Sequence, residues 1–176
     1  MYPILRLAKE LYVHRNDPPL EIFDTHVSHH ICWPNDIDIW MELNNGRTLT
    51  LFDLGRVVMF KRLGINDLII RKKWAGTVAG SSIRYRRRVT TFMKLEMRSR
   101  VIGWDERFIY LEQGMYHKGE CTSHVLMRTA VTDRTRIIPT AEVAAALGAS
   151  PESPPLPGWV QNFADAAGER PWPPHL

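Results

Sequence analysis

Three carboxylates stand close together in the chain, Asp36, Asp38 and Glu42, just before an Asn-Asn-Gly turn. A carboxylate can attack an activated carbonyl or deprotonate the water that attacks it. Such a reaction also needs donors for the oxygen that becomes negative, and the free amides at a helix start supply them with a partial positive charge. Asn44 and Asn45 favour a helix start because their side-chain oxygens accept from the first amides. The stretch therefore indicates a reactive carboxylate beside a helix N-terminus.

The segment after this turn has the spacing of a long buried helix. Its apolar side chains recur three and four residues apart, at Leu49, Leu51, Phe52, Leu54, Val58, Met59 and Leu63. Gly64 is a natural stop, since glycine commonly ends helices. A helix with so wide an apolar face needs a sheet to cover it.

The rest of the chain alternates apolar and polar residues as strands do. We expect strands over residues 21–33, 81–90, 93–103, 107–117 and 121–132. Short turns join the last three, and strands joined without a crossover helix are antiparallel. Short helices are expected over residues 3–14 and 139–147, and residues 65–76 form either a short helix or an irregular segment. The predicted fold class is α+β, one long antiparallel sheet wrapped around one central helix.

The length and composition are those of one globular domain. The 176 residues are 44% hydrophobic and 24% charged. We expect an N-terminal extension over residues 1–19, a core domain over 20–148 and a Pro-rich tail over 149–176 with little to add to a core. The apolar runs fall short of the roughly 18–20 residues that a membrane span needs. The N-terminal helix is expected either to pack on the domain or to lie on a membrane surface.

The first residues do not resemble a signal peptide, because charges are interspersed among the apolar residues. Two cysteines, Cys32 and Cys121, are too few for a disulfide framework and favour reduced thiols in the cytoplasm. The histidines His26 and His30 share a strand face but stand roughly 13 Å apart, so we expect no metal and no other cofactor.

The string DIDIWMELNNGR, the FDLGR that follows it and the order of elements resemble the hotdog-fold thioesterases, in particular the acyl-CoA thioesterases related to 4-hydroxybenzoyl-CoA thioesterase. The likeness covers about residues 20–135. It implies that Asp38 is the nucleophile or general base on the thioester and that Asn44 and Asn45 shape the turn. Three residues depart from the family pattern of Asn, His and Tyr, namely Trp40, Glu42 and Thr48.

The resemblance also assigns roles outside the turn. Glu42 is either an assisting base or a surface acid. Gly80 and Ser81 lie near the acyl carbonyl, or else simply begin a strand. Arg84 and Arg86, in the run RYRRR, either contact the phosphates of coenzyme A or belong to a solvated face. The net charge of +4 suits an anionic ligand.

The implied partners are an acyl-CoA substrate and a second copy of the chain, in a homodimer or a dimer of dimers. Two alternatives remain open. One is an acyl-thioester binding protein without catalysis, suggested by the three departures from the family pattern. The other is a nucleic-acid-associated protein that uses the RYRRR run, although a basic run of one short strand is thin support and no nucleic acid is expected.

Overall fold

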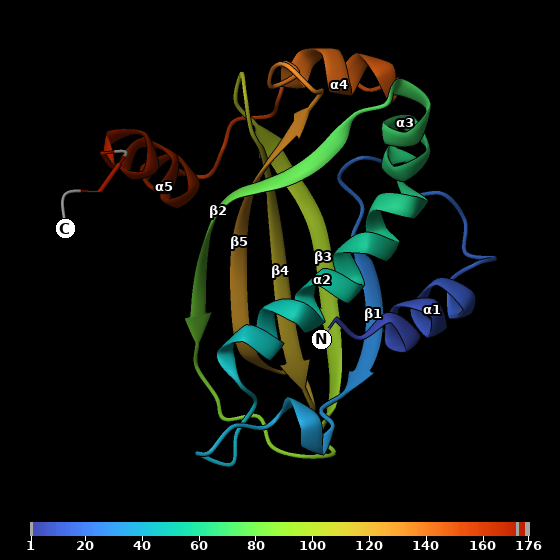
Figure 1. Ribbon diagram of the computed structural model, residues 1–176, viewed down its shortest axis with the longest axis vertical. Coiled ribbons are helices and arrows are strands. Elements are labelled where there is room, and N and C mark those ends of the chain that lie inside the picture. Colours follow the sequence, from blue (N-terminus) through green and yellow to red (C-terminus); the bar gives the residue numbers. More distant parts are fainter. Residues whose placement is uncertain (1, 172, 175–176) are drawn as a thin grey trace.

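A single long helix lies across one face of a five-stranded antiparallel sheet in the computed structural model, which describes residues 2–171, 173 and 174 (Figure 1). The helix is α2 (Asn45–Arg62). The strands stand in the order β1-β3-β4-β5-β2, with bounds β1 (His26–Ile31), β2 (Ala75–Tyr85), β3 (Lys94–Trp104), β4 (Ile109–His117) and β5 (Glu120–Thr132). The predicted α+β class, with a sheet wrapped around one central helix, is confirmed.

The apolar face of α2 forms the centre of the core, as its spacing predicts. Its most buried side chains are Leu51, Phe52, Leu54, Val58 and Met59, each at most 1% exposed. All of these except Val58 belong to one cluster with inward-facing residues of β3, β4 and β5. Gly55 allows the closest approach of helix and sheet, because a Cβ there would lie 2.8 Å from the sulfur of Met97. After Leu63, Gly64 takes a positive φ of 74° and ends the helix at the predicted place.

Two strands differ from their predicted bounds. The first covers only His26–Ile31, since the residues before it form turns. The second begins six residues earlier than predicted, directly after α3 (Ile65–Lys72), and pairs with β5 from Ala75↔Thr132 to Tyr85↔Ser123. The predicted stretch 86–90 therefore lies beyond the strand. The pairing of β2 with β5 ends at Tyr85 and Ser123. Beyond this pair the ladder stops, because the Arg86 and Arg87 amides both donate to one acceptor, the Thr122 carbonyl.

Three more helices contact the sheet, two of them outside residues 20–148. Helix α1 (Ile4–Val13) lies beside β1, and α4 (Thr140–Ala146) lies at one end of the sheet (Figure 1). Helix α5 (Gly158–Glu169) was not predicted, because a Pro- and Ser-rich stretch precedes it. Its Val160 is fully buried against Tyr110 and Leu126, on the face of the sheet away from α2. Residues 172, 175 and 176 of the predicted tail lie outside the described residues.

Strands β1 and β2 form the two edges of the sheet. Nearly every residue of β2 is exposed, including Val78 at 49% and Tyr85 at 45%. Among the helices of the described residues, none combines the length and the apolar composition that a bilayer crossing requires.

Candidate active site

The loop before α2 is held in place by Asp36, whose side chain is 1% exposed. Its carboxylate accepts from Arg6 Nη1 at 2.7 Å and from Arg47 Nε at 3.1 Å, and it also accepts from the Trp33 amide at 3.0 Å. Its carbonyl accepts from the Asn44 amide at 2.9 Å. Asp36 therefore uses its charge to fix the loop.

Asp38 lies in a tight turn that the same loop forms next. The Asp38 amide donates to the Glu42 carbonyl at 2.9 Å, and Ile37 pairs with Leu43 across the turn. Asp38 is half-buried as a residue, and its carboxylate Oδ1 accepts from the Trp40 amide at 2.9 Å in a bond that is open to solvent. The tip of the turn carries three exposed apolar residues, Ile39, Trp40 and Met41, which are 86%, 70% and 69% exposed.

The start of α2 is capped as its sequence predicts. Asn44 Oδ1 accepts from the Gly46 amide at 2.9 Å and from the Arg47 amide at 3.3 Å. Asn45 is the first residue of the helix and is exposed. The Asn44 side chain is therefore occupied by the cap, whereas Asn45 stands at the mouth of the site with the positive end of the helix behind it.

A cavity of about 240 Å³ opens at this mouth. One wall is formed by Glu42, Asn45 and Thr48, and the other by the chain that leaves β2, residues 85–89, with Ser123 of β5. Glu42 accepts from Arg88 Nε at 2.8 Å across the cavity. The structure therefore joins the carboxylate-bearing turn and the arginine run, which lie far apart in the sequence. Asp38 stands in the adjoining turn and does not line this cavity.

Three predicted site residues lie elsewhere. Gly80 and Ser81 are in the middle of β2, not at its start, and a Cβ on Gly80 would lie 3.8 Å from Phe163 of α5. Arg84 lines a different cavity together with Glu112, His124 and Trp159, while Arg86 lines the cavity at the mouth. Strand alternation explains part of this separation, because Arg84 faces the opposite side of β2 from Tyr85, which does line the mouth.

A second carboxylate lies midway along α2. Asp53 accepts from the Tyr2 hydroxyl at 2.7 Å and is ion-paired with Arg56, as the spacing of three residues predicts. Both line a largely apolar cavity of about 360 Å³ between α2 and strands β2 and β5. Arg56 is only 7% exposed, and its Nη1 donates to Gln113 Oε1 at 3.2 Å. Burial lowers the pKa of Arg56. The sequence does carry a signal for this buried charge, namely an arginine between Phe52 and Met59 on the apolar face of the helix.

The described residues hold no group of three or more His, Cys, Asp or Glu side chains placed to bind a metal ion. His26 and His30 both face the interior from β1, where each is at most 5% exposed. Burial is the main reason that the pKa of His26 falls to about 4 and that of His30 to about 3. Both imidazoles are therefore neutral at pH 7.

Comparison with solved structures shows which fold this arrangement belongs to. The probable thioesterase YbaW from Escherichia coli superimposes with a TM-score of 0.63 over 69% of this chain and 96% of that one, at 17% identity. A thioesterase from Thermus thermophilus, complexed with coenzyme A and Zn, gives a TM-score of 0.59 over 66% and 90% of the two chains, at 20% identity. The predicted hotdog fold is confirmed.

Sequence comparison gives the family. The chain is 31% identical over 94 residues to Protein THEM6 of Drosophila melanogaster, which is 53% of this chain and 49% of that one. It is 34% identical over 98 residues to Protein THEM6 of Xenopus laevis, or 55% and 47% of the two chains. The chain thus spans about half the length of the curated relatives it matches. Residues 32–163 match the family described as the thioesterase-like superfamily, so the chain belongs to this superfamily.

Proposed function

We propose that the protein hydrolyses an acyl-CoA thioester at the start of α2, with Asp38 as general base or nucleophile. The observation that carries this proposal is the position of Asp38, whose carboxylate is held by the Trp40 amide in a turn that leads directly into the capped N-terminus of α2. Membership in the thioesterase-like superfamily supports the reaction class. The bound thioester provides the electrophile, so the protein must supply a base, donors and a binding surface.

In the general-base route, Asp38 takes a proton from a water whose oxygen attacks the thioester carbonyl. The carbon–sulfur bond then breaks, the acyl group leaves as a carboxylic acid, and the coenzyme A sulfur takes up a proton. The backbone amides of Gly46 and Arg47 already donate to the Asn44 side chain. We therefore assign the backbone amide of Asn45 as the donor to the carbonyl oxygen of the thioester. A donor of this kind contributes on the order of 10²–10³ in rate.

The arginines that line the cavity at the start of α2 carry the charge needed to bind the phosphates of coenzyme A. Arg86, Arg87 and Arg88 line the cavity and bring positive charge to it, although Arg87 is ion-paired with Glu120 and Arg88 with Glu42. Glu42 accepts from Arg88, so we assign Glu42 the role of orienting this arginine. The solved Thermus thermophilus thioesterase of the same fold contains coenzyme A, which supports a coenzyme A thioester as substrate.

A second copy of the chain would complete the slot. Strand β2 is an edge strand with mostly exposed residues, and pairing of two such edges would satisfy their free backbone groups. The exposed tip formed by Ile39, Trp40 and Met41 stands beside Asp38 and offers an apolar wall for an acyl chain or for the partner. We therefore propose a homodimer as the active unit, alone or within a dimer of dimers.

Cys32 and Cys121 are free thiols, and burial is the main cause that raises the pKa of Cys32 to about 11. A protein with unpaired thiols suits a reducing compartment, and we propose the cytoplasm.

The test is a panel of short, long and aromatic acyl-CoAs with detection of the free thiol. We expect Asp38→Asn to lower kcat on the order of 10²–10⁴-fold, the range of a lost general base. Asp67→Asn, an exposed aspartate on α3, is the matched control and leaves kcat unchanged. Asp53→Asn tests the second carboxylate.

Loss of turnover in Asp53→Asn with full activity in Asp38→Asn would move the reaction to the cavity between α2 and β2. Tight acyl-CoA binding by the wild-type chain without any thiol release would instead favour the non-catalytic binding protein. A salt-dependent complex with RNA at physiological ionic strength, lost on changing Arg86 and Arg88 to Gln, would favour the nucleic-acid alternative.

A further inference from the structure

Helix α1 turns Arg6 and Glu10, together with Leu7, toward the protein and leaves an apolar stripe facing solvent. Glu10 on its inner side is only 2% exposed. On its outer side Leu5 is 87%, Ile4 69% and Tyr12 65% exposed. A helix whose only role is to cover a core is expected to bury its apolar side chains and to expose its charged ones.

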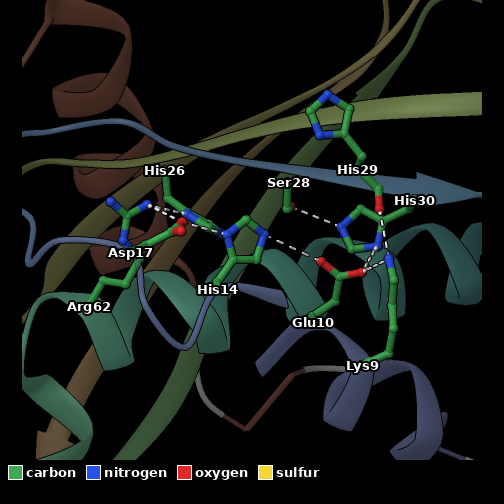
Figure 2. A network of polar contacts seen from close by, with 9 residues as sticks. All are labelled: Lys9, Glu10, His14, Asp17, His26, Ser28, His29, His30 and Arg62. Carbon is green, nitrogen blue, oxygen red and sulfur yellow. Dashed lines mark hydrogen bonds and ion pairs between the residues drawn. The ribbon is translucent and has the colours of Figure 1, made fainter. Parts of the chain in front are cut away.

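A buried polar network fixes this orientation (Figure 2). Glu10 is ion-paired with Lys9 at 2.6 Å, and its oxygens lie 3.7 Å from His14 Nε2 and 3.8 Å from His30 Nδ1. One turn earlier, Arg6 donates to the Ile31 carbonyl at 2.8 Å, at the free edge of β1. Rotating α1 to bury its apolar stripe would break the bond from Arg6 to Ile31 and the contact between Glu10 and His30, which join α1 to β1. The apolar stripe is therefore held outward.

The network itself offers no second reaction site. Ser28 Oγ lies 2.9 Å from His30 Nε2, and with Glu10 this gives the order of a Ser-His-Glu triad. Ser28 is fully buried, however, and a Cβ on Gly55 would lie 3.2 Å from its hydroxyl. No substrate reaches an oxygen enclosed between the sheet and α2. The contacts serve to hold α1.

The apolar stripe meets a neighbouring loop at Leu5, which lines the same cavity as Trp33. A cavity of about 720 Å³ separates Leu5 of α1 from Trp33 and is lined by both. Trp33 is 44% exposed and contacts the ring of Phe92, itself 63% exposed, edge-on. We call the set Ile4, Leu5, Tyr12, Trp33 and Phe92 the outer α1 surface. An apolar surface of this kind marks an interaction site.

Positive charges surround the outer α1 surface. Arg15 lies over the Tyr12 ring at 3.8 Å, and Lys94 and Lys118 line the cavity beside the Lys9–Glu10 pair. The acids nearby are already paired. Glu10 is paired with Lys9, and Glu96 with Arg98 at 2.7 Å. The surface therefore presents aliphatic and aromatic side chains inside a cationic rim.

We propose that the outer α1 surface docks the protein onto an anionic phospholipid bilayer. Aliphatic residues enter the outer acyl region, Trp and Tyr occupy the interface, and lysines attract anionic headgroups. An anionic bilayer matches this arrangement, because its headgroups carry the charge opposite to that of the cationic rim. Docking of this kind would bring the protein to the membrane, into which long-chain acyl compounds partition. It stands independently of the proposed reaction.

The test is flotation of the full-length chain with phosphatidylcholine vesicles, with and without a third of phosphatidylglycerol, at low and at physiological salt. We expect binding only to the anionic vesicles, weaker at higher salt. The Leu5→Asn and Tyr12→Asn variants should each lower the partition coefficient about tenfold. Ile70→Asn is the matched control, because Ile70 is 76% exposed on α3, away from this surface, and it should bind like wild type.

A second pair of variants separates charge from apolar contact. Lys94→Gln and Lys118→Gln should each lower binding to anionic vesicles roughly fivefold. Thermal unfolding of every variant checks that the fold is intact, and Leu5 and Tyr12 are exposed enough to be replaced without unfolding. Equal flotation of wild type, Leu5→Asn and Ile70→Asn would overturn the proposal, as would no flotation at all. A concentration-dependent dimer that Leu5→Asn abolishes would assign the surface to a second copy of the chain instead.

Discussion

Helices α1 and α2 are held in the fold by different balances of contact, although Leu7 of α1 also packs on the core. The inner face of α2 is built from side chains such as Leu51, Phe52 and Met59, each at most 1% exposed. The inner side of α1 carries Glu10, linked to Lys9 and facing His14 and His30. Apolar burial is strong but not directional, whereas hydrogen bonds and ion pairs fix one orientation. The comparison indicates that α2 supplies most of the stability and that polar contacts determine which side of α1 faces out.

The two helices also begin differently. Asn44 caps α2 through its side chain, while α1 begins after Pro3 without a side-chain cap. Helix α2 is thus fixed at the end where the site lies. Helix α1 depends on contacts along its length.

The largest expected effect is on α2. Phe52→Ala should lower the free energy of unfolding by about 3–5 kcal/mol, because it leaves a cavity in the core. Phe92→Ala removes an equally large ring that is 63% exposed, and it should change the stability by less than about 0.5 kcal/mol. Urea unfolding of both variants measures the two changes in the free energy of unfolding. Equal losses would show that the contacts of α2 do not dominate the core.

Acid should act on the α1 contacts. The pKa values of His26 and His30 are lowered by burial to about 4 and about 3, so below their ordinary value of 6.5 the unfolded chain binds protons that the folded chain does not. Stability is therefore full above about pH 6.5 and falls as the pH drops toward 4. Between pH 7 and pH 5 each histidine should lower the free energy of unfolding by about 2 kcal/mol. Nearby cations also favour the neutral imidazoles, Arg6 and Lys9 for His30 and His14 and Arg62 for His26, while Asp17 opposes them at His26.

Urea unfolding at the two pH values measures this loss. His30→Gln should remove about half of it, whereas His29→Gln, with a side chain 73% exposed, should leave it unchanged. Hydrogen exchange at pH 5 should show the α1 amides opening before those of α2. A wild-type stability that is the same at pH 7 and pH 5 would contradict the buried, neutral state of both imidazoles.

The smallest expected effect is at the cap of α2. Asn44→Ala removes the acceptor of the Gly46 and Arg47 amides and should cost about 1 kcal/mol. Asn45→Ala is the natural control, since Asn45 is exposed and caps neither amide, and it should be neutral in stability. Thermal unfolding of the pair distinguishes the two asparagines. A larger loss in Asn45→Ala would reassign the cap.

The sequence predicted the parts of the site that depend on local chemistry. The Asn44 cap follows from the preference of short polar side chains for helix starts, and α2 follows from its apolar spacing. The joining of Glu42 to Arg88 could not be predicted, because 46 residues separate them and only the return of the chain after β2 brings them together. The separation of Arg84 from Arg86 depended in turn on the position of β2, which was predicted six residues too late.

The sequence by itself determined the fold class, the central helix and the succession of antiparallel strands, because their periodic patterns reflect burial along a single element. Only the tertiary structure decided which faces of α1 and β1 lie inside. Alternation along residues 23–32 separates two faces but does not say that the polar one, with His26, Ser28 and His30, is buried. Polar side chains can occupy an interior when partners from distant segments satisfy them, and those partners exist only once the chain has folded.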